Sequence, residues 1–347
     1  MIHHPDFNLT DYNTFGLPAR ARDYAAFERT EDIVQLLDRT GGEPPLLLLG
    51  SGSNLLLLSK LDGWVWHNRI TDLEVITQSA TAVHLRIGGG YNWNELVQLT
   101  LKNGWAGLEN LSLIPGTVGA APVQNIGAYG AELADCCTSV EAVDLTTGRQ
   151  LHLPAADCGF AYRDSRFKRQ LGRYVITHVH LRLTPVARAE VNTDYGDISR
   201  TLADWGITRP APTDVAGAVV SIRRSKLPDW RLLGNAGSFF KNPVVSRLQL
   251  AELTAAHGDI PAYPLDEFSV KLPAGWLIDR AGWRGRTVGR VGCYEKQALV
   301  IVNRGGAAGE EVLAFSEMVQ AGVRDKFGVE LEREVRVVGE QRDSDTE

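Results

Sequence analysis

Hydrophobic positions recur along the chain with two different spacings. Some segments place apolar residues three or four positions apart, which predicts amphipathic helices at residues 31–39, 92–102, 214–224, 247–257 and 310–327. Others alternate or are apolar throughout, which predicts strands at residues 46–49, 84–87 and 175–183 and a hairpin over 139–153. Helices and strands are mixed over the whole length, so the pattern favours an α+β architecture over a strict βαβ alternation.

The predicted strand at residues 175–183 alternates cleanly between two faces. Val175, Val179 and Leu183 lie on its apolar face, whereas His178 and His180 lie on the opposite one. We interpret both histidines as exposed strand residues rather than metal ligands, and the sequence predicts no metal site.

Length and composition narrow the class of protein. The chain has 347 residues, which is long for one core, so two or three domains are expected. It has no apolar run long enough to cross a bilayer, and its N-terminus lacks the basic start and apolar run of a secretion signal, which favours the cytoplasm. A formal charge of −6 argues against a broad nucleic-acid surface. The four cysteines form no Cys-x-x-Cys pair, so we interpret them as structural or incidental.

Three glycine-rich segments are candidates for binding a nucleotide. Residues 50–54 read Gly-Ser-Gly-Ser-Asn and offer backbone N–H groups and hydroxyls that suit a pyrophosphate, without a Rossmann fingerprint or a Walker lysine. Residues 88–90 are all glycine, and residues 114–130 are glycine-rich with almost no charge. Any one of them could be an ordinary turn. Together they indicate an extended dinucleotide such as FAD.

Residues 237–243, Gly-Ser-Phe-Phe-Lys-Asn-Pro, place chemically useful polar groups around two aromatics. We expect the phenylalanines to anchor the segment in a core while its polar side chains turn the other way. Such a segment holds a weak acid, a cation and an amide at one place. An ordinary buried turn is the alternative.

Two charged segments fit either a functional or a structural role. The planar guanidinium of Arg163 can donate two parallel hydrogen bonds to a carboxylate. Spacing alone slightly favours a structural ion pair with Asp164 instead. Residues 331–338 alternate as a charged strand, with Glu332 and Glu334 on one side, and by default this is a solvated edge.

Taken together, these segments resemble the UDP-N-acetylenolpyruvoylglucosamine reductases, the flavoenzymes of peptidoglycan precursor synthesis. The matching motifs occur in family order over nearly the whole chain, at residues 13–16, 50–54, 114–130, 162–165, 237–243, 273–279 and 334–336. The resemblance implies a two-part FAD-binding unit of the vanillyl-alcohol-oxidase type with a separate α+β substrate domain. The implied boundaries are 1–66 and 67–222 for the two FAD-binding subdomains and 223–327 for the substrate-binding domain, with a C-terminal strand at 328–347 that returns near the active site.

The resemblance also implies the reaction. NADPH reduces bound FAD, the flavin N5 gives hydride to C3 of the enolpyruvyl ether, and C2 is protonated to leave UDP-N-acetylmuramate. Ser238 matches the proton donor to C2, and Arg163 and Glu334 match residues at the substrate carboxylate. Arg163 would stabilise the negative charge that develops there. A glutamate at this position makes sense only if it is protonated or hydrogen-bonded, so we expect a raised pKa for Glu334.

Further positions match the family's substrate and cofactor contacts. Lys226 would be the point charge on phosphate, Tyr195 a stacking or hydroxyl contact, and Tyr263 part of a mobile loop over the uridine that marks one subgroup. Asn242 and Gln297 match other substrate-side positions. The implied cofactor-binding residues are Gly50, Ser51, Gly52, Ser53, Asn54, Pro115, Gly116, Gly119, Asn125, Gly127, Ala128 and Tyr129. We expect the FAD to be non-covalent, because residues 50–54 contain neither His nor Cys.

Several alternatives stay open. Glu332 is a possible rival to Glu334, although the Glu-Val-Arg context selects Glu334. An FAD-dependent oxidase or dehydrogenase of an alcohol or hydroxy acid would share the flavin loops, but it has no evident use for residues 238–242. A non-catalytic flavin- or nucleotide-binding module would bind FAD without turnover. The expected partners are small-molecule substrates, with no nucleic acid and no membrane.

Overall fold

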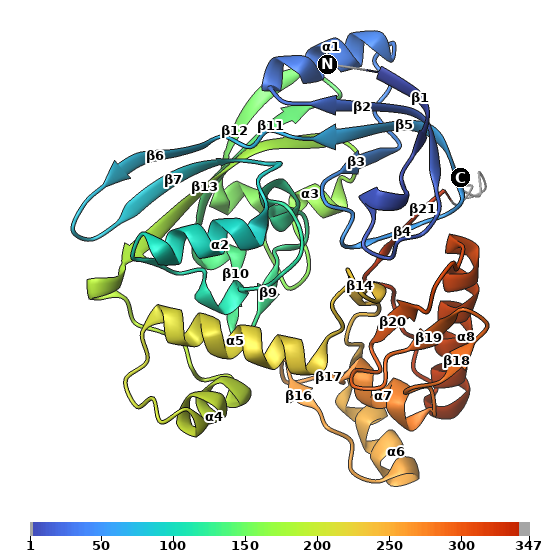
Figure 1. The fold of residues 1–347 in the computed structure, drawn as a ribbon. Helices are drawn as coiled ribbons and strands as arrows, with labels where there is room; N and C mark the ends of the chain where they lie inside the picture. The colour runs from blue at the N-terminus through green and yellow to red at the C-terminus, as the bar shows by residue number, and fades with distance from the viewer. Residues whose placement is uncertain (1–2, 340–347) are drawn as a thin grey trace. The chain divides into compact units, whose positions relative to one another are not determined.

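The computed structural model describes residues 3–339, and the backbone divides into two compact units. Within the described residues, the first unit comprises residues 3–7, 21–51 and 62–225, and the second comprises residues 8–20, 52–61 and 226–339. Both units mix helices with strands, as Figure 1 shows, so the predicted α+β class is confirmed.

A four-stranded sheet begins the first unit (Figure 1). Its strands lie in the order β1 (His3–Asn8), β2 (Arg20–Phe27), β5 (Lys60–Asn68) and β3 (Leu47–Leu49). The helix predicted at residues 31–39 is α1 (Thr30–Arg39), and its apolar stripe packs Ile33 and Leu36 into one cluster with Phe27 and Trp66. Each of these side chains is fully buried, so the helix is held by its core face.

A second sheet carries the rest of the first unit. Its strands lie in the order β12 (Arg149–Pro154), β11 (Cys137–Asp144), β13 (Tyr174–Pro185), β7 (Val83–Gly88) and β6 (Leu73–Gln78), and β8 (Trp105–Ala106) pairs with β13. The predicted hairpin is the β11–β12 pair, which pairs Asp144 with Arg149 next to its turn. The paired strands are all antiparallel, so each pleat sends alternate side chains to one face.

Helices and short turns cover this second sheet (Figure 1). They are α2 (Trp93–Lys102), the hairpin β9 (Gly127–Ala128) with β10 (Ala131–Glu132), and α3 (Arg166–Arg169). The charge-free segment at 114–130 forms a 3₁₀ helix at Val118–Gln124 and then this hairpin, and most of it is buried or half-buried. Two further helices, α4 (Gly196–Asp204) and α5 (Pro212–Lys226), pack on each other through Ile198, Leu202, Val215 and Val219.

The second unit is built on three small sheets. Their strands are β14 (Gly234–Ser238), β20 (Val300–Asn303), β19 (Val291–Cys293) and β18 (Thr287–Val288); β15 (Val244–Ser246), β17 (Ser269–Lys271) and β16 (Tyr263–Pro264); and β21 (Arg336–Val338) beside β4 (Leu55–Leu57). The helices are α6 (Arg247–His257), α7 (Ala274–Arg280) and α8 (Gly309–Phe327). The inward side chains predicted for α8, including Phe315 and Val323, are buried, and Gly328 ends the helix with a φ of 61°.

Two sequence-based expectations were wrong in detail. His178 is not exposed: it retains 4% of its accessible surface, because Arg86 and Asp72 lie over the same face of β13 and bond its ring. His180 is half-buried rather than exposed. The strand predicted at residues 331–338 is present only as Arg336–Val338. It is not a solvated edge there, because it pairs in parallel with β4.

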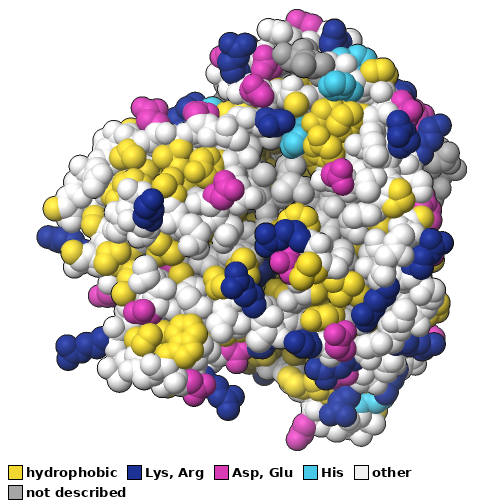
Figure 2. Space-filling model, viewed as in Figure 1, with side chains coloured by type: hydrophobic (Ala, Val, Ile, Leu, Met, Phe, Trp, Pro, Cys, Tyr) yellow, Lys and Arg dark blue, Asp and Glu magenta, His cyan; other side chains and the backbone are white. Residues whose placement is uncertain are grey.

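The surface and the helices add two further observations. On the face seen in Figure 2, basic and acidic side chains are interspersed with apolar ones. Across residues 3–339, no helix combines the length and the hydrophobicity that crossing a lipid bilayer demands.

Candidate active site

The segment at residues 237–243 takes its shape from a bulge at the end of β14. The β14–β20 pairing shifts register between Asn235 and Ser238, and Gly237 between them has a φ of 73°, a value that glycine adopts without strain. Phe239 and Phe240 then enter the core with 0% and 1% of their surface exposed, while Ser238 remains exposed. The predicted anchoring by the phenylalanine pair is therefore confirmed.

The two candidate glutamates lie on the strand-like stretch that runs beside this segment. Phe240 pairs with Arg333 in an isolated antiparallel bridge, and the N–H of Glu334 donates to the carbonyl of Phe239 at 2.8 Å. Glu334 is half-buried and lies across from the residue that follows Ser238. Glu332 is exposed and forms an ion pair with Lys241. The two carboxyl groups therefore have different surroundings.

The start of α7 brings two more predicted residues to the same place. The side-chain oxygen of Asn242 accepts the N–H of Ala274, the first residue of α7, at 2.9 Å. The Oε1 atom of Gln297 lies 3.0 Å from the position of a Cβ on Gly275, which follows Ala274. The second unit thus collects Ser238, Glu334, Asn242 and Gln297 around one segment and one helix start.

The remaining substrate-side candidates lie on element ends. Tyr263 in β16 is 56% exposed and pairs with Lys271, which in turn pairs with Val244, two residues after Asn242. Lys226 is the last residue of α5, and it is exposed.

In the first unit, the side chain of Arg163 contacts the hairpin formed by β9 and β10. Its Nη2 donates to the carbonyl of Gly127 at 2.7 Å, and its backbone has a φ of 54°. The guanidinium lies 5.4 Å from the centre of the Tyr162 ring. Asp164 forms its ion pair with Arg169. The structure therefore gives Asp164 a partner other than the one weighed from the sequence.

The turn of that hairpin also carries Tyr129, which has a φ of 53°. Its ring meets that of Tyr195 edge to face, with centroids 5.3 Å apart, and burial raises the pKa of its hydroxyl. Asn125 precedes the hairpin and holds it through a 2.6 Å bond from its amide to Glu132. Arg163, Tyr129 and Tyr195 are thus brought together around the hairpin.

The glycine-rich loops of the first unit pack backbone against backbone. A Cβ on Gly119 would lie 2.9 Å from the Cα of Gly89, and the N–H of Gly119 donates to the carbonyl of Gly89 at 2.7 Å. A Cβ on Gly50 would lie 2.6 Å from the hydroxyl of Thr117. Because the atoms close to Gly119 belong to the backbone of Gly89, a side chain at position 119 would force the two loops apart. Beside Gly50, the hydroxyl of Ser51 is buried and has no hydrogen-bond partner among the described residues.

The remaining loop positions contact their own surroundings. Gly116 accepts the N–H of Trp93 through its carbonyl at 3.1 Å, and Pro115 before it is exposed. In the second unit, the carbonyl of Gly52 accepts the N–H of Thr14, and the amide of Asn54 donates to the carbonyl of Glu334 at 3.2 Å. Asn54 therefore lies next to the backbone of one predicted catalytic residue. Ser53 and Ala128 are half-buried.

Sequence reasoning missed Arg223 on α5. Its Nε is buried and has no hydrogen-bond partner among the described residues, and burial lowers the pKa of its guanidinium, an effect that the nearby Tyr129 opposes. The only available signal was its position one helical turn before Lys226, which places both on one face.

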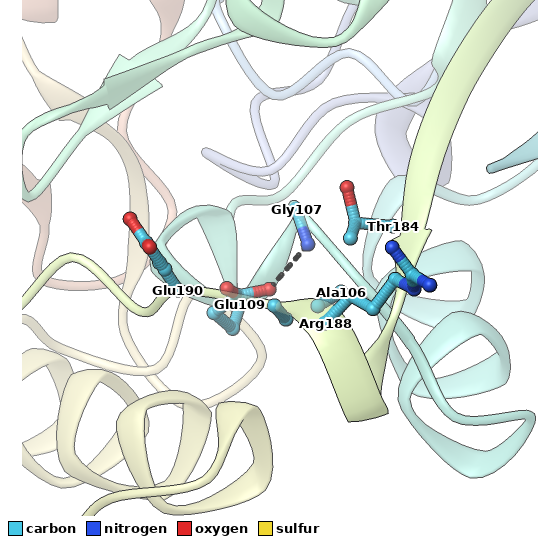
Figure 3. Close-up of a pocket in the computed structure, with 7 residues that line it drawn as sticks. Ala106, Gly107, Glu109, Thr184, Arg188 and Glu190 are labelled. Atoms are coloured by element: carbon cyan, nitrogen blue, oxygen red, sulfur yellow. Dashed lines mark hydrogen bonds between the residues drawn. The ribbon is translucent and has the colours of Figure 1, made fainter. Parts of the chain in front are cut away.

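A shallow pocket of about 240 Å³ lies elsewhere in the first unit (Figure 3). In it, the buried carboxylate of Glu109 accepts the N–H of Gly107 at 2.7 Å, with Arg188 and Glu190 at the rim. None of the residues predicted from the sequence lines this pocket, so we assign it no role in the candidate site.

The chain is similar to known proteins over nearly its whole length. Residues 228–338 match the family model of the UDP-N-acetylenolpyruvoylglucosamine reductase C-terminal domain, and residues 24–154 match that of an FAD binding domain. The chain is 49% identical over 335 residues to the UDP-N-acetylenolpyruvoylglucosamine reductase of Azoarcus sp. (strain BH72), covering 95% of this chain and 96% of that protein. It is 48% identical over 334 residues to the protein of the same name from Burkholderia cenocepacia (strain HI2424), covering 95% of both chains.

A solved structure shows the same fold. The UDP-N-acetylenolpyruvylglucosamine reductase of Thermus caldophilus matches with a TM-score of 0.64 and 24% identity, covering 97% of this chain and 98% of that one. The chain therefore shares the fold of that structure over nearly its whole length. With relatives close to half identical over almost the full chain, this protein belongs to the UDP-N-acetylenolpyruvoylglucosamine reductase family, and it is an FAD-containing oxidoreductase.

Proposed function

We propose that this enzyme uses NADPH to reduce UDP-N-acetylglucosamine enolpyruvate to UDP-N-acetylmuramate in the cytoplasm. Family membership supports the reaction class, and one structural observation supports the chemistry most directly. The exposed hydroxyl of Ser238 is carried on a backbone that is held on both sides, because Phe239 donates to the carbonyl of Leu299 at 2.9 Å and accepts from Glu334 at 2.8 Å. A proton donor and a carboxyl group are thereby fixed on neighbouring segments.

The residues of the glycine loops fit FAD. The buried hydroxyl of Ser51 has no hydrogen-bond partner among the described residues and suits a phosphate oxygen. We assign the cofactor to Gly50, Ser51, Gly52, Ser53, Asn54, Pro115, Gly116, Gly119, Asn125, Gly127, Ala128 and Tyr129, without a covalent bond. The chemistry that bound FAD would supply at these residues is hydride transfer from NADPH to C3 of the enolpyruvyl group.

Ser238 supplies the proton to C2 in this proposal. A serine hydroxyl is a poor acid in water, so the step needs substrate to exclude water around it. The bulge before Ser238 and the buried phenylalanines after it fix the direction of the hydroxyl. No rearrangement of this backbone is then needed during the reaction, which lowers the entropic cost of protonation.

Arg163 and Glu334 act on the substrate carboxylate. Hydride addition at C3 builds negative charge there, and the guanidinium of Arg163 stabilises that charge. Its bond to the carbonyl of Gly127 orients the guanidinium, which supports this role. Glu334 would contribute as the protonated acid, which requires a raised pKa. The exposed ion pair of Glu332 with Lys241 favours Glu334 over its neighbour.

Other polar residues bind the uridine and diphosphate parts of the substrate in this proposal. We assign Lys226 to phosphate, Tyr195 to a ring or hydroxyl contact, and Asn242 and Gln297 to polar contacts at the start of α7. The exposure of Tyr263 supports its role in a loop that closes over the uridine. The three-domain boundaries at residues 66, 222 and 327 are part of the same proposal.

Separate half-reactions test the proposed function. In the absence of oxygen, NADPH is expected to bleach the flavin of the purified protein, and the enolpyruvyl sugar is expected to restore its colour. A flavin that is re-oxidised by molecular oxygen but not by the sugar would instead point to the oxidase alternative. A flavin that NADPH does not bleach would point to the non-catalytic module.

A further inference from the structure

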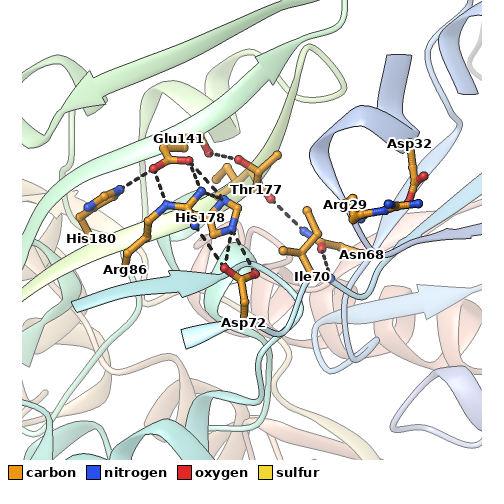
Figure 4. A network of polar contacts seen from close by, with 11 residues as sticks. Arg29, Asp32, Asn68, Ile70, Asp72, Arg86, Glu141, Thr177, His178 and His180 are labelled. Carbon is orange, nitrogen blue, oxygen red and sulfur yellow. Dashed lines mark hydrogen bonds and ion pairs between the residues drawn. The ribbon is translucent and has the colours of Figure 1, made fainter. Parts of the chain in front are cut away.

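A cluster of histidine and acidic side chains lies on one face of the second sheet, in the first unit, and Figure 4 shows Glu141 and His180 from it. Glu141 is on β11, the central strand of three neighbours. His152 on β12 lies directly opposite Glu141 in the register, and His180 on β13 lies opposite Ser139, two residues from Glu141. Because residues two apart point to the same face of a strand, the pleat alone brings these three side chains together.

The geometry of the three side chains suits one metal ion. The Nε2 atom of His180 is 2.7 Å from Oε1 of Glu141, and the rings of His152 and His180 have centroids 5.1 Å apart. One ligand atom from each residue lies within 4.8 Å of the other two. A tetrahedral zinc ion with bonds of about 2.0–2.2 Å separates its ligand atoms by about 3.3–3.6 Å. His152 is exposed and the other two residues are half-buried. Small rotations of the side chains can therefore bring the three ligand atoms to the separations that a zinc ion requires.

Glu141 is held as an oriented carboxylate. Its Oε1 accepts from Nε of Arg86 and its Oε2 from Nη2 of Arg86, both at 2.8 Å, and His178 lies 3.2 Å from Oε2. These contacts and the 2.7 Å contact from His180 fill the four acceptor positions of the carboxylate, so that His180 holds only one of them.

The surrounding charge favours a cation despite Arg86. Asp72 also pairs with Arg86, at 3.2 Å, and both its oxygens lie 3.2 Å from Nε2 of His178. Two carboxylates thus face one guanidinium, which leaves the cluster net negative when the imidazoles are neutral. These outer contacts are of the kind that fix the orientation of metal ligands in proteins.

We propose that Glu141, His152 and His180 form a binding site for one Zn²⁺ ion. The metal takes the place of the proton between Glu141 and His180, and the exposed ring of His152 supplies the third ligand. Two imidazoles and one carboxylate with an open position form a donor set that zinc accepts, whereas Mg²⁺ and Ca²⁺ prefer oxygen ligands. Bound zinc would join β11, β12 and β13 and stabilise the folded protein, because the unfolded chain lacks the assembled site.

Isothermal titration with ZnCl₂ tests this on untagged protein that has been stripped of metal with a chelator. The wild-type chain is expected to bind one zinc ion in the micromolar range, and His152→Gln to bind at that site about tenfold more weakly or worse. His84→Gln is the matched control, because His84 lies on β7, two residues from Arg86, outside the three-ligand cluster. It is expected to bind as the wild type does.

The thermal midpoint gives a second readout. At one fixed zinc concentration, the midpoint is expected to rise in the wild type and in His84→Gln and to rise clearly less in His152→Gln, because weaker binding stabilises the folded protein less. Because His152 is exposed, its substitution is expected to leave the fold intact even if His180→Gln does not. Equal zinc affinity and equal thermal shifts in the wild type and His152→Gln would overturn the proposal, as would a wild-type chain that binds no zinc.

Discussion

Replacing Ser238 with alanine removes one hydroxyl and little else. The side chain is exposed, while the backbone around it is held by β20 and by the buried rings of Phe239 and Phe240. The free energy of unfolding is therefore expected to change by less than about 0.5 kcal/mol. If the hydroxyl is the acid that protonates C2, its loss is expected to slow product formation by about 10²-fold or more, which is about 2.7 kcal/mol in the activation free energy.

The two half-reactions of Ser238→Ala separate catalysis from damage. Stopped-flow absorbance of the flavin is expected to show reduction by NADPH within about twofold of the wild-type rate, and re-oxidation by the enolpyruvyl sugar slowed by about 10²-fold or more. Ser238→Cys is expected to recover part of the lost rate, because a thiol with an ordinary pKa of about 8.5 is also a proton donor.

Ser246→Ala is the matched control. Ser246 lies in the same unit and caps α6 by accepting the N–H of Gln249 at 3.0 Å. Its loss is expected to cost about 1 kcal/mol of stability and to leave both half-reactions unchanged. If Ser238→Ala slowed the two half-reactions equally, or neither of them, Ser238 would not be the proton donor.

Further predictions concern the other charged residues. Glu334→Ala is expected to lower kcat by about 10²-fold or more. Glu332→Gln removes only an exposed ion pair and is expected to keep kcat within about twofold. Equal losses of kcat in steady-state kinetics would contradict the choice of Glu334 over Glu332. Lys226→Ala is expected to raise KM for the sugar far more than it lowers kcat, and an unchanged KM would refute the phosphate contact. Hydrogen bonds from Arg173 hold the pKa of Asp144 at about 2, below its ordinary value of 3.8. A depressed pKa contributes stability above pH ~4 that is lost as the pH falls towards 2. Urea unfolding is therefore expected to show Asp144→Asn less stable than the wild type at neutral pH, with the difference narrowing below pH 4. If the stability difference between the two proteins did not change with pH, ionised Asp144 would not be the source of that stability.

Much of the local structure could be predicted because apolar residues are regularly spaced along the helices and strands. The stripe of α8 and the alternation of β13 both mark real core faces. The segment around Phe239 was interpretable because an exposed serine between a glycine and two buried rings leaves few conformations open.

Long-range contacts explain what the sequence did not reveal. His178 is buried by Arg86 on β7 and by Asp72 in the segment just before β6, so the alternation of its own strand could not predict it. Residues 8–20 and 52–61 join the second unit although they come early in the chain. Their pairing, such as that of β4 with β21, leaves no local pattern. For the same reason, the buried Nε of Arg223 and the approach of His152 to Glu141 were visible only in the fold.

The most direct test of the proposed reaction is NADPH oxidation by the purified holoenzyme, followed by NADPH absorbance with and without UDP-N-acetylglucosamine enolpyruvate. Oxidation is expected to require the sugar and to consume one NADPH for each sugar reduced. Oxidation at the same rate in the absence of the sugar would contradict the proposed reaction and would favour an FAD-dependent oxidase.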